Sequence, residues 1–252
     1  LNEWIRVRDY RVGQLNRMAN VSLYRDSRLS AGDVREFGAA HVVIATGARW
    51  RGDGVGRCHH RPVSGSDNGL ALTPEDVFAG SPIAGPVIVF DDEHYYMGGV
   101  VAEELRSRGL AVMLVTPAGN PSAWTEASLE QPYIQTRLLE GGIEIRVGQQ
   151  VASIGNGVVE LACTYTGRTT RQEARAVVMV TSRLPIDGLY HELMADGPGL
   201  RAAGIRSVNR IGDCLNPGTI AAAVYAGHRY ARELDAPVAD PPFRVEHVAH
   251  VG

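Results

Sequence analysis

Several features that would point to a partner are missing from this sequence of 252 residues. The formal net charge is only −3, with positive and negative side chains interspersed, so no basic surface is available to attract nucleic acid or an anionic membrane. No apolar run approaches the roughly 20 residues that a membrane-spanning helix needs. We therefore expect neither nucleic acid nor a membrane as a partner.

Cysteine is scarce as well. The three cysteines, Cys58, Cys163 and Cys214, are far apart and form no CxxC pair. Such a set does not suit a disulfide framework or a metal cluster, and it favours a reducing compartment, with cytoplasm as the expected location. The run Cys58-His59-His60 has ligand-type side chains, but three consecutive residues rarely converge on one ion, so we predict a solvated loop and no metal site.

The hydrophobic fraction of 44% is high enough for real cores, and the length allows one or two domains. The sequence begins with Leu1, and residues 1–18 resemble a helix from within a domain more than a signal peptide. We expect the chain to be a portion of a longer protein.

One candidate ligand-binding segment follows an apolar run. The run His41–Ala45 predicts a buried strand, and it ends in Thr46, Gly47 and Ala48. Small residues at the end of a parallel strand let the backbone approach a dinucleotide, although a tight turn requires the same residues. A short strand is also expected at Val21–Tyr24.

A second candidate segment lies near the end of the sequence. It reads as an apolar strand that ends in Gly212 and Asp213, then a Pro/Gly turn, then a helix that opens at Thr219 and Ile220. A helix start presents unpaired N–H groups and the positive end of its dipole, which suits phosphate or a flavin carbonyl. Asp213 could accept hydrogen bonds from a ligand hydroxyl, or it could be a helix-entry residue only.

Residues 86–183 have the pattern of a separate unit. Strand Val87–Phe90, helix Gly98–Arg108 and strand Ala111–Val115 form a βαβ sequence of the length seen in dinucleotide-binding domains. A hairpin around Asn156-Gly157 then precedes a last buried strand at Ala174–Val180. From Pro185 the chain is expected to return to the first unit, and residues 237–252 to run extended over the surface.

The first loop of this βαβ unit departs from the dinucleotide pattern. It reads DDEHYYMGG in place of GxGxxG, so Asp91, Asp92 and Glu93 stand where phosphates would bind. Desolvating like charges together is costly, and we therefore predict that this unit does not bind NAD or NADP. The alternative is that Gly98 and Gly99 form a shifted loop that still binds a nucleotide.

Taken together, five separated segments resemble the carboxyl-terminal nucleotide-binding region of the trimethylamine, dimethylamine and histamine dehydrogenase family, which is related to 2,4-dienoyl-CoA reductase. The segments are IATGARW at Ile44–Trp50, TPE at Thr73–Glu75, YYM followed by AEEL, SLEQPYIQTRL at Ser128–Leu138, and IGD followed by AGHRYARE. The resemblance covers nearly the whole sequence.

The resemblance implies an α/β fold with two Rossmann-like, three-layer units of the FAD/NAD(P)-binding type, the second inserted in the first. Residues 1–85 and 184–252 would form an FAD- or ADP-binding-type domain that lacks its first βαβ, and residues 86–183 the inserted domain. Without that first βαβ the strand at His41 would keep an apolar face and an open edge. We expect the missing residues to precede Leu1 in the native protein or to come from another chain.

The resemblance also implies cofactors and partners. ADP or FAD would bind this region, with FMN and a 4Fe-4S cluster only in a preceding barrel region, and no catalytic residue or metal ligand here. The barrel region, an electron-transfer-flavoprotein-like acceptor and a second copy in a homodimer are the expected partners. Tyr95 and Tyr96 could form part of an acceptor docking face or could be ordinary packing groups. The residues that match the remaining nucleotide-facing motifs are Thr46, Gly47, Ala48, Gly212, Asp213, Thr219 and Ile220.

The leading functional hypothesis is a structural and docking portion of a flavin and iron–sulfur amine dehydrogenase. One alternative is an NAD(P)H-dependent flavin oxidoreductase of the 2,4-dienoyl-CoA reductase type. The other is a stand-alone, non-catalytic module that binds a nucleotide or a partner protein.

Overall fold

The structure, a computed structural model, describes residues 2–234. The chain divides into two compact units: unit 1 comprises Leu1–Arg28 and Arg49–Leu184, and unit 2 comprises Leu29–Ala48 and Pro185–Gly252. Both contain helices and parallel strands, so the fold is α/β. Within the described part, no helix is long and apolar enough to cross a membrane.

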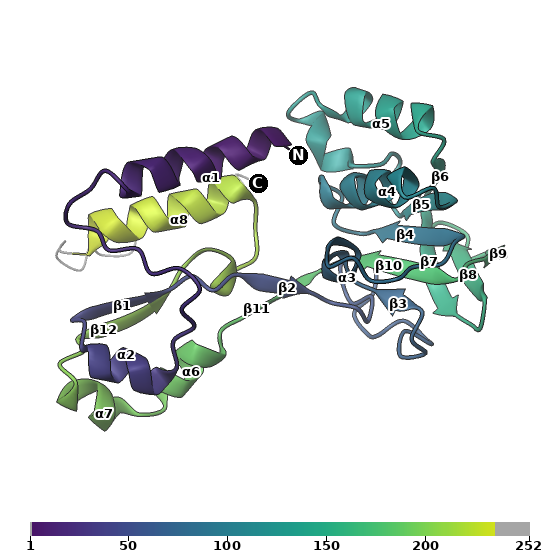
Figure 1. The fold of residues 1–252 in the computed structure, drawn as a ribbon. Helices are drawn as coiled ribbons and strands as arrows, with labels where there is room; N and C mark the ends of the chain where they lie inside the picture. The colour runs from purple at the N-terminus through teal and green to yellow at the C-terminus, as the bar shows by residue number, and fades with distance from the viewer. Residues whose placement is uncertain (1, 235–252) are drawn as a thin grey trace, which may run out of the picture. The chain divides into compact units, whose positions relative to one another are not determined.

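Unit 1 contains most of the regular structure (Figure 1). Its helices are α1 (Asn2–Leu15), α3 (Pro74–Phe78), α4 (Met97–Ser107), the 3₁₀ turn η1 (Ala123–Glu126) and α5 (Gln131–Glu140). Its strands are β3 (Ala71–Leu72), β4 (Val87–Asp91), β5 (Val112–Thr116), β6 (Glu144–Val147), β7 (Gln149–Ile154), β8 (Val158–Cys163), β9 (Thr169–Glu173) and β10 (Ala176–Val180). Strands β2 (Ala48–Trp50) and β11 (Arg183–Pro185) pair where the chain passes between the units.

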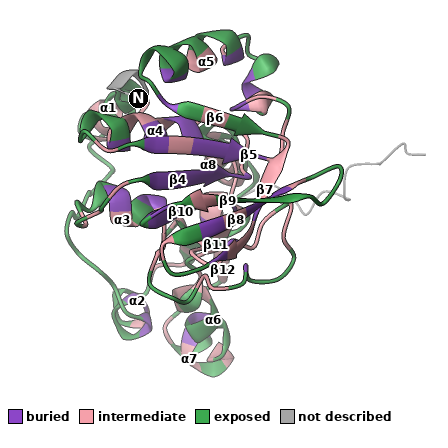
Figure 2. Cartoon of the chain, turned by 90° about the vertical axis from the view of Figure 1, so that its right-hand side faces the viewer, coloured by how far each residue is buried: buried purple, intermediate pink, exposed green. Residues whose placement is uncertain are grey.

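A five-stranded parallel sheet with the order β3-β10-β4-β5-β6 is the centre of unit 1. Every residue of β4 and β10 is buried, and Figure 2 shows both strands in purple. Strands covered on both faces read as continuous apolar runs rich in β-branched residues, which explains why both were predictable from the sequence.

The two faces of this sheet are covered by different elements, because successive side chains of a strand point to opposite sides. Val87 and Val89 pack with residues of α3, α4 and α5. Ile88 and Phe90 pack instead with residues of β7 and β8, which belong to the antiparallel sheet β7-β8-β9. The hairpin predicted around Asn156-Gly157 is confirmed as the β7–β8 pair.

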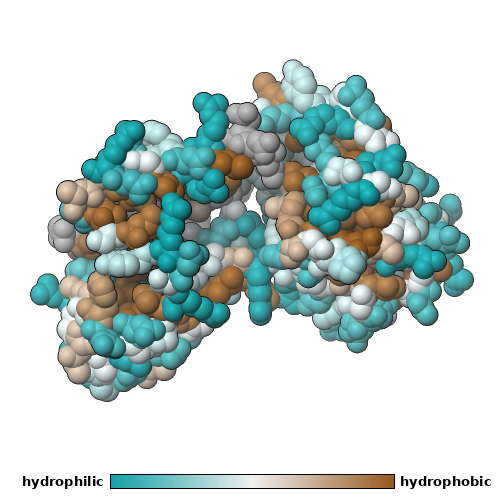
Figure 3. All heavy atoms as spheres, viewed as in Figure 1, coloured by the Kyte–Doolittle hydropathy of each residue, from teal (hydrophilic) through white to brown (hydrophobic). Residues whose placement is uncertain are grey.

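Unit 2 is smaller and less covered. Its elements are α2 (Ala31–Phe37), β1 (His41–Ile44), α6 (Gly188–Met194), α7 (Gly197–Ala202), β12 (Ser207–Arg210), the 3₁₀ turn η2 (Gly212–Cys214) and α8 (Ile220–Glu233). β1 pairs with β12 in parallel, and the core is one cluster that includes Val34, Ile44 and Cys214. No residue of α8 is buried. Figure 3 shows hydrophobic atoms at the surface in the part that holds β1, β12 and α2.

Three local predictions were wrong. Val21–Tyr24 forms no strand and is exposed, because no described strand offers it a pairing edge. The run His41–Ala45 does form β1, but only Ile44 in that strand is buried, since few described elements pack on it. β12 ends at Arg210, and the chain then tightens into η2, so Gly212 and Asp213 lie in a 3₁₀ turn. The predicted extended tail, residues 237–252, lies outside the described residues.

The two units differ from the predicted domains in two segments, residues 1–28 and 49–85, both of which belong to unit 1. Residues 49–85, predicted to belong to the first domain, group with the five-stranded sheet, because β3 pairs with β10 and Val63 packs in the same cluster as Phe90. The assignment of the two domains to FAD/ADP and NAD(P) types stays a prediction.

Candidate nucleotide-binding sites

The loop that follows β4 lies at a position where open parallel sheets bind ligands. β4 lies between β10 and β5 in the sheet. The strand order reverses at β4, because β5 and β6 follow on one side of it and β10 lies on the other. Such a reversal in strand order opens a crevice beyond the strand ends. The predicted degenerate phosphate loop, residues 91–99, occupies this point and leads into α4.

Asp91, the last residue of β4, is completely buried. Its Oδ1 accepts the backbone N–H of His94 at 3.0 Å, and burial raises the pKa of its carboxyl to about 7, with Glu93 adding to the rise. A Cβ placed on Gly98, in the first turn of α4, would lie 2.5 Å from Asp91 Cγ and 2.8 Å from its Oδ2. The carboxyl of Asp91 therefore lies directly against the backbone of the helix start.

Asp92 is also completely buried, but it points to a different segment. Its Oδ2 accepts the backbone N–H groups of Arg57 and Cys58, at 2.5 and 2.9 Å. A Cβ on Gly56 would lie 2.4 Å from the same oxygen, so only glycine fits there. His94 Nε2 lies 3.6 Å from Asp92 Oδ1, while burial lowers the pKa of His94. Asp92 thus fixes the loop at residues 56–58 to the end of β4.

Glu93 is partly buried, and burial raises the pKa of its carboxyl against the opposing effect of Arg183. The Arg183 guanidinium lies 4.0 Å from Glu93 Oε1. The backbone N–H groups of Asp92 and Glu93 both donate to the carbonyl of Val180, at 2.9 and 3.1 Å. The three acids therefore do not extend into solvent: each is drawn into the protein and held by separate contacts.

The residues predicted to face a flavin or ADP lie in unit 2. The hydroxyl of Thr46 donates to the carbonyl of Ile186 and lies 3.2 Å from Cys214 Sγ, so it is used inside the protein. Gly47 has a φ of +80°, and no described atom lies within 4 Å of the position of a Cβ. Open space beside this backbone fits the approach of a flat ligand. Ala48 begins β2.

The second predicted segment lies at the start of α8. Asp213 Oδ1 accepts the N–H of Gly218 at 3.0 Å, and the hydroxyl of Thr219 accepts the N–H of Ala222 at 3.3 Å as the helix cap. Ile220 is the first helical residue and is 50% exposed. Gly212 lies against α8, where a Cβ would be 3.6 Å from the side chain of Ala223. Asp213 is thus a loop-fixing residue, and the backbone around Gly47 and the start of α8 fit a nucleotide better than these side chains do.

Metal ligands do not gather in the described residues. No group of three or more His, Cys, Asp or Glu side chains there could hold a metal ion, so these residues do not fit a 4Fe-4S cluster. Cys58 is half-buried, and burial with the nearby Asp92 raises the pKa of its thiol to about 12. A neutral thiol is a poor metal ligand and a poor nucleophile.

Tyr95 and Tyr96 lie between full burial and full exposure. Their ring centroids are 4.2 Å apart, and the hydroxyl of Tyr96 donates to Glu130, which raises the pKa of Tyr96 further after burial. Trp124 lies next to this segment, because its backbone N–H donates to the backbone carbonyl of His94 at 2.9 Å. The side chains of Trp124, Leu129 and Tyr133 are 53, 78 and 75% exposed. We name Tyr95, Tyr96, Trp124, Leu129 and Tyr133 the aromatic face.

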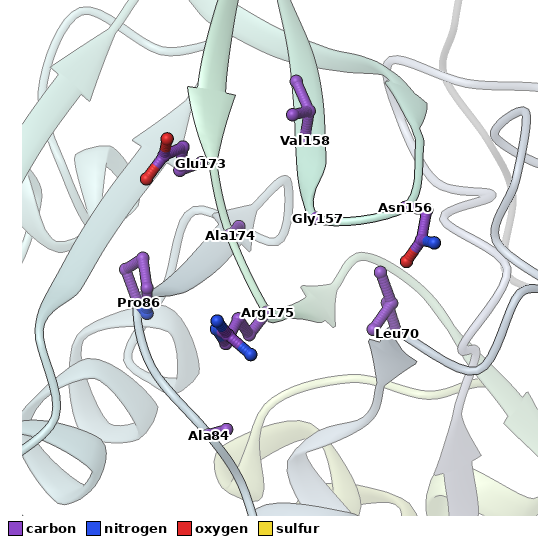
Figure 4. A pocket seen from close by; sticks show the side chains of 9 residues that line it. All are labelled: Leu70, Ala84, Pro86, Asn156, Gly157, Val158, Glu173, Ala174 and Arg175. Atoms are coloured by element: carbon purple, nitrogen blue, oxygen red, sulfur yellow. The ribbon is translucent and has the colours of Figure 1, made fainter.

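A separate surface hollow of about 510 Å³ lies at the opposite end of the sheet (Figure 4). Pro86 and Arg175, which precede β4 and β10, line it together with the turn at Asn156 and Gly157. None of the predicted site residues takes part in it, so it is not the predicted nucleotide site.

Sequence reasoning found the three acids but missed their partners. Gly56 and Arg57 directly precede Cys58, Arg183 follows the predicted strand Ala174–Val180, and only the folded chain brings them to the end of β4. The glycine-rich sequence from Gly52 to Gly56 was the available signal, because such a segment permits close backbone approach.

Comparisons with known proteins identify the family to which this chain is similar. Residues 72–181 match the OYE-like second alpha/beta domain family. The chain is 34% identical to the dimethylamine dehydrogenase of Hyphomicrobium sp. (strain x) over 96% of its own length and 36% of that protein. It superposes on histamine dehydrogenase from Rhizobium sp. 4-9 with 46% identity and a TM-score of 0.92, covering 98% of this chain and 39% of that one. For 6-hydroxypseudooxynicotine amine oxidase from Pseudomonas geniculata N1 the values are 50%, 0.87, 91% and 34%.

The chain spans about a third of the length of these relatives, which are themselves named as oxidoreductases acting on amines. The match covers 96–98% of this chain and therefore extends across both units. The chain belongs to the trimethylamine, dimethylamine and histamine dehydrogenase family.

Proposed function

We propose that this chain is the carboxyl-terminal portion of a flavin-dependent amine dehydrogenase, where it serves as a nucleotide-binding scaffold and electron-acceptor docking module with no catalytic residue of its own. In this proposal it consists of two Rossmann-like units, one inserted in the other. Unit 2 holds ADP or FAD, and FMN and the 4Fe-4S cluster belong to a preceding barrel region. The amine is oxidised in that region.

The observation that carries this proposal is the state of the loop after β4. A domain that accepts hydride from NAD(P)H needs space and bare amides for a pyrophosphate at the start of the following helix. Here Asp91 lies against Gly98 in that space. Asp92 and Glu93 bring two further carboxyls to the same strand end. The loop therefore favours a structural role over a reductase role.

The proposed nucleotide site in unit 2 uses backbone more than side chains. The open space beside Gly47 and the N-terminal turn of α8 would receive the ligand, and Gly212, with a φ of +58°, turns the chain into η2. Bound ADP or FAD would supply negative phosphates to a helix start whose first turn carries no acidic residue.

The aromatic face is the proposed docking surface for an electron-transfer-flavoprotein-like acceptor. Exposed aromatic and large apolar side chains are typical anchors of protein interfaces. Trp124 also lies under the Arg57 guanidinium, 4.0 Å from the ring centroid, which holds an exposed ring in a fixed orientation.

The experiment that tests the proposal uses the native, longer protein that contains this chain. We expect it to contain FMN, iron–sulfur cluster and ADP or FAD, and we expect its flavin to be reduced anaerobically by an alkylamine or by histamine. A native protein without flavin, or a flavin that no amine reduces, would contradict the proposal. The docking role has its own test: Trp124→Ala with Leu129→Asp should slow acceptor reduction several-fold while amine-dependent flavin reduction stays unchanged.

A further inference from the structure

The start of α4 has the properties of an anion-binding site. No side chain from its cap position or its first turn accepts hydrogen bonds from the N–H groups there. Tyr96 occupies the cap position, but its side chain makes no capping hydrogen bond to the helix start, and the first turn holds no acidic residue. Helix starts of this kind present N–H groups and a positive dipole end that favour a carboxylate or a phosphate. The helix has 11 residues, so its dipole is fully developed.

Asp91 is directed into this position. Its side chain is completely buried and contacts the backbone of Gly98, as the distance of 2.7 Å from a Gly98 Cβ to Asp91 Cβ shows. Among the described residues, Asp91 Oδ2 has no hydrogen-bond partner. A buried oxygen without a partner is costly, and it is retained where another requirement outweighs the cost. The most direct requirement here is the filling of the space beside Gly98.

We infer that Asp91 closes the phosphate position of unit 1 by occupying it, and that this one side chain is the main reason why the loop rejects a nucleotide diphosphate. The inference rests on the proposed function and deepens it, because it replaces general repulsion by the three acids with a defined residue and a defined mechanism. In this inference a ligand phosphate would need the space that the Asp91 side chain fills beside Gly98.

The charges in the loop indicate that Asp91 excludes a phosphate by filling its position and not by electrostatic repulsion. With a pKa raised to about 7, the carboxyl of Asp91 carries only part of a negative charge near neutral pH. Asp92 is bound by two backbone N–H groups, and Glu93 faces Arg183. Each negative charge is therefore reduced or balanced locally, whereas the volume of the Asp91 side chain is present at every pH.

Two substitutions at Asp91 separate the mechanisms. Asp91→Gly removes both the volume and the charge, whereas Asp91→Asn keeps the volume and removes only the charge. We expect Asp91→Gly to bind NADH at least about tenfold more tightly than the unchanged chain, and Asp91→Asn to remain within about twofold of it. NADH fluorescence and calorimetry with inorganic pyrophosphate measure the binding, and any site in unit 2 contributes equally to all three proteins.

Each outcome decides the inference. Equal gains in Asp91→Gly and Asp91→Asn would overturn occupancy in favour of repulsion, and no gain in either variant would overturn the role of Asp91. If Asp91→Gly does not fold, as judged by circular dichroism, Asp91→Ala is measured against the same expectation. Tight NADH binding by the unchanged chain at this loop would instead contradict the proposed function itself, so the two failures are distinguishable.

Discussion

The parallel sheets of the two units differ in how completely the chain covers them. In unit 1, helices α3, α4 and α5 cover one face and the β7–β9 sheet covers the other, and β4 and β10 are fully buried. In unit 2, only one residue of β1 and none of β12 is buried, and α8 buries no residue at all. Unit 1 therefore supplies its own core, whereas unit 2 leaves apolar surface that a neighbouring segment or chain would complete.

The largest expected effect comes from the core of unit 1. Phe90→Ala should lower the free energy of unfolding by about 3–5 kcal/mol, because the ring is fully buried between the sheet and β7–β8. Val43→Ala in β1, where the side chain is smaller and 36% exposed, is the comparison in unit 2 and should cost about 1 kcal/mol or less. Urea denaturation measures both. Equal losses in the free energy of unfolding would contradict the difference in burial between the two sheets.

The next prediction concerns pH. The pKa of Asp91 rises from 3.8 to about 7 on folding, so the folded state binds a proton that the unfolded state releases between these values. Asp91 therefore lowers stability progressively from pH 4 to pH 7, and the loss remains above pH 7. Asp91→Asn should be more stable than the unchanged chain by about 2–4 kcal/mol at pH 8, with little difference near pH 4. A pH-independent difference in melting temperature would contradict this assignment.

A smaller effect is expected at the start of α4. Gly98→Ala places a methyl group 2.5 Å from Asp91 Cγ and should cost about 1–3 kcal/mol. Gly99→Ala is the control, since its nearest neighbour would be Ile134 Cγ2 at an ordinary 3.5 Å. The double variant Asp91→Gly, Gly98→Ala should recover most of the loss. If the double variant is no more stable than Gly98→Ala alone, the two residues are not coupled.

The smallest effect is expected in unit 2. Thr219→Ala removes the cap of α8 and should cost about 1 kcal/mol. Thr73→Ala removes the corresponding cap of α3, whose Pro74 and Val77 are buried, and should cost at least as much. Amide hydrogen exchange should be faster in α8 than in α4 in the unchanged chain, because α8 buries no side chain. Slower exchange in α8 would remove the proposed difference in coverage.

The sequence was most informative where one local signal decides the structure. The apolar run Val87–Phe90 and the turn at Asn156-Gly157 each predicted the observed element. The sequence was least informative where contacts with neighbouring elements decide the structure. The short strands β3 and β9 depend on pairing with β10 and β8, and the failure of Val21–Tyr24 reflects the lack of a described partner edge.

The candidate site shows the same division. The acids and glycines of the loop after β4 identified a departure from the phosphate-binding pattern, but not its mechanism. That Asp91 lies against Gly98, while Asp92 holds the segment at residues 56–58, depends on tertiary contacts that no spacing rule contains. In unit 2, the sequence located Thr46 correctly at the end of a strand, but its hydroxyl faces Ile186 and Cys214.

The most direct test of the central claim, that unit 1 is a scaffold and not a point of hydride entry, is rapid mixing of NADH or NADPH with the native flavoprotein under anaerobic conditions. We predict no flavin reduction that saturates with nicotinamide nucleotide, while an amine substrate reduces the same flavin. Flavin reduction that saturates with NADH or NADPH, and that is lost on blocking the loop after β4, would contradict the account.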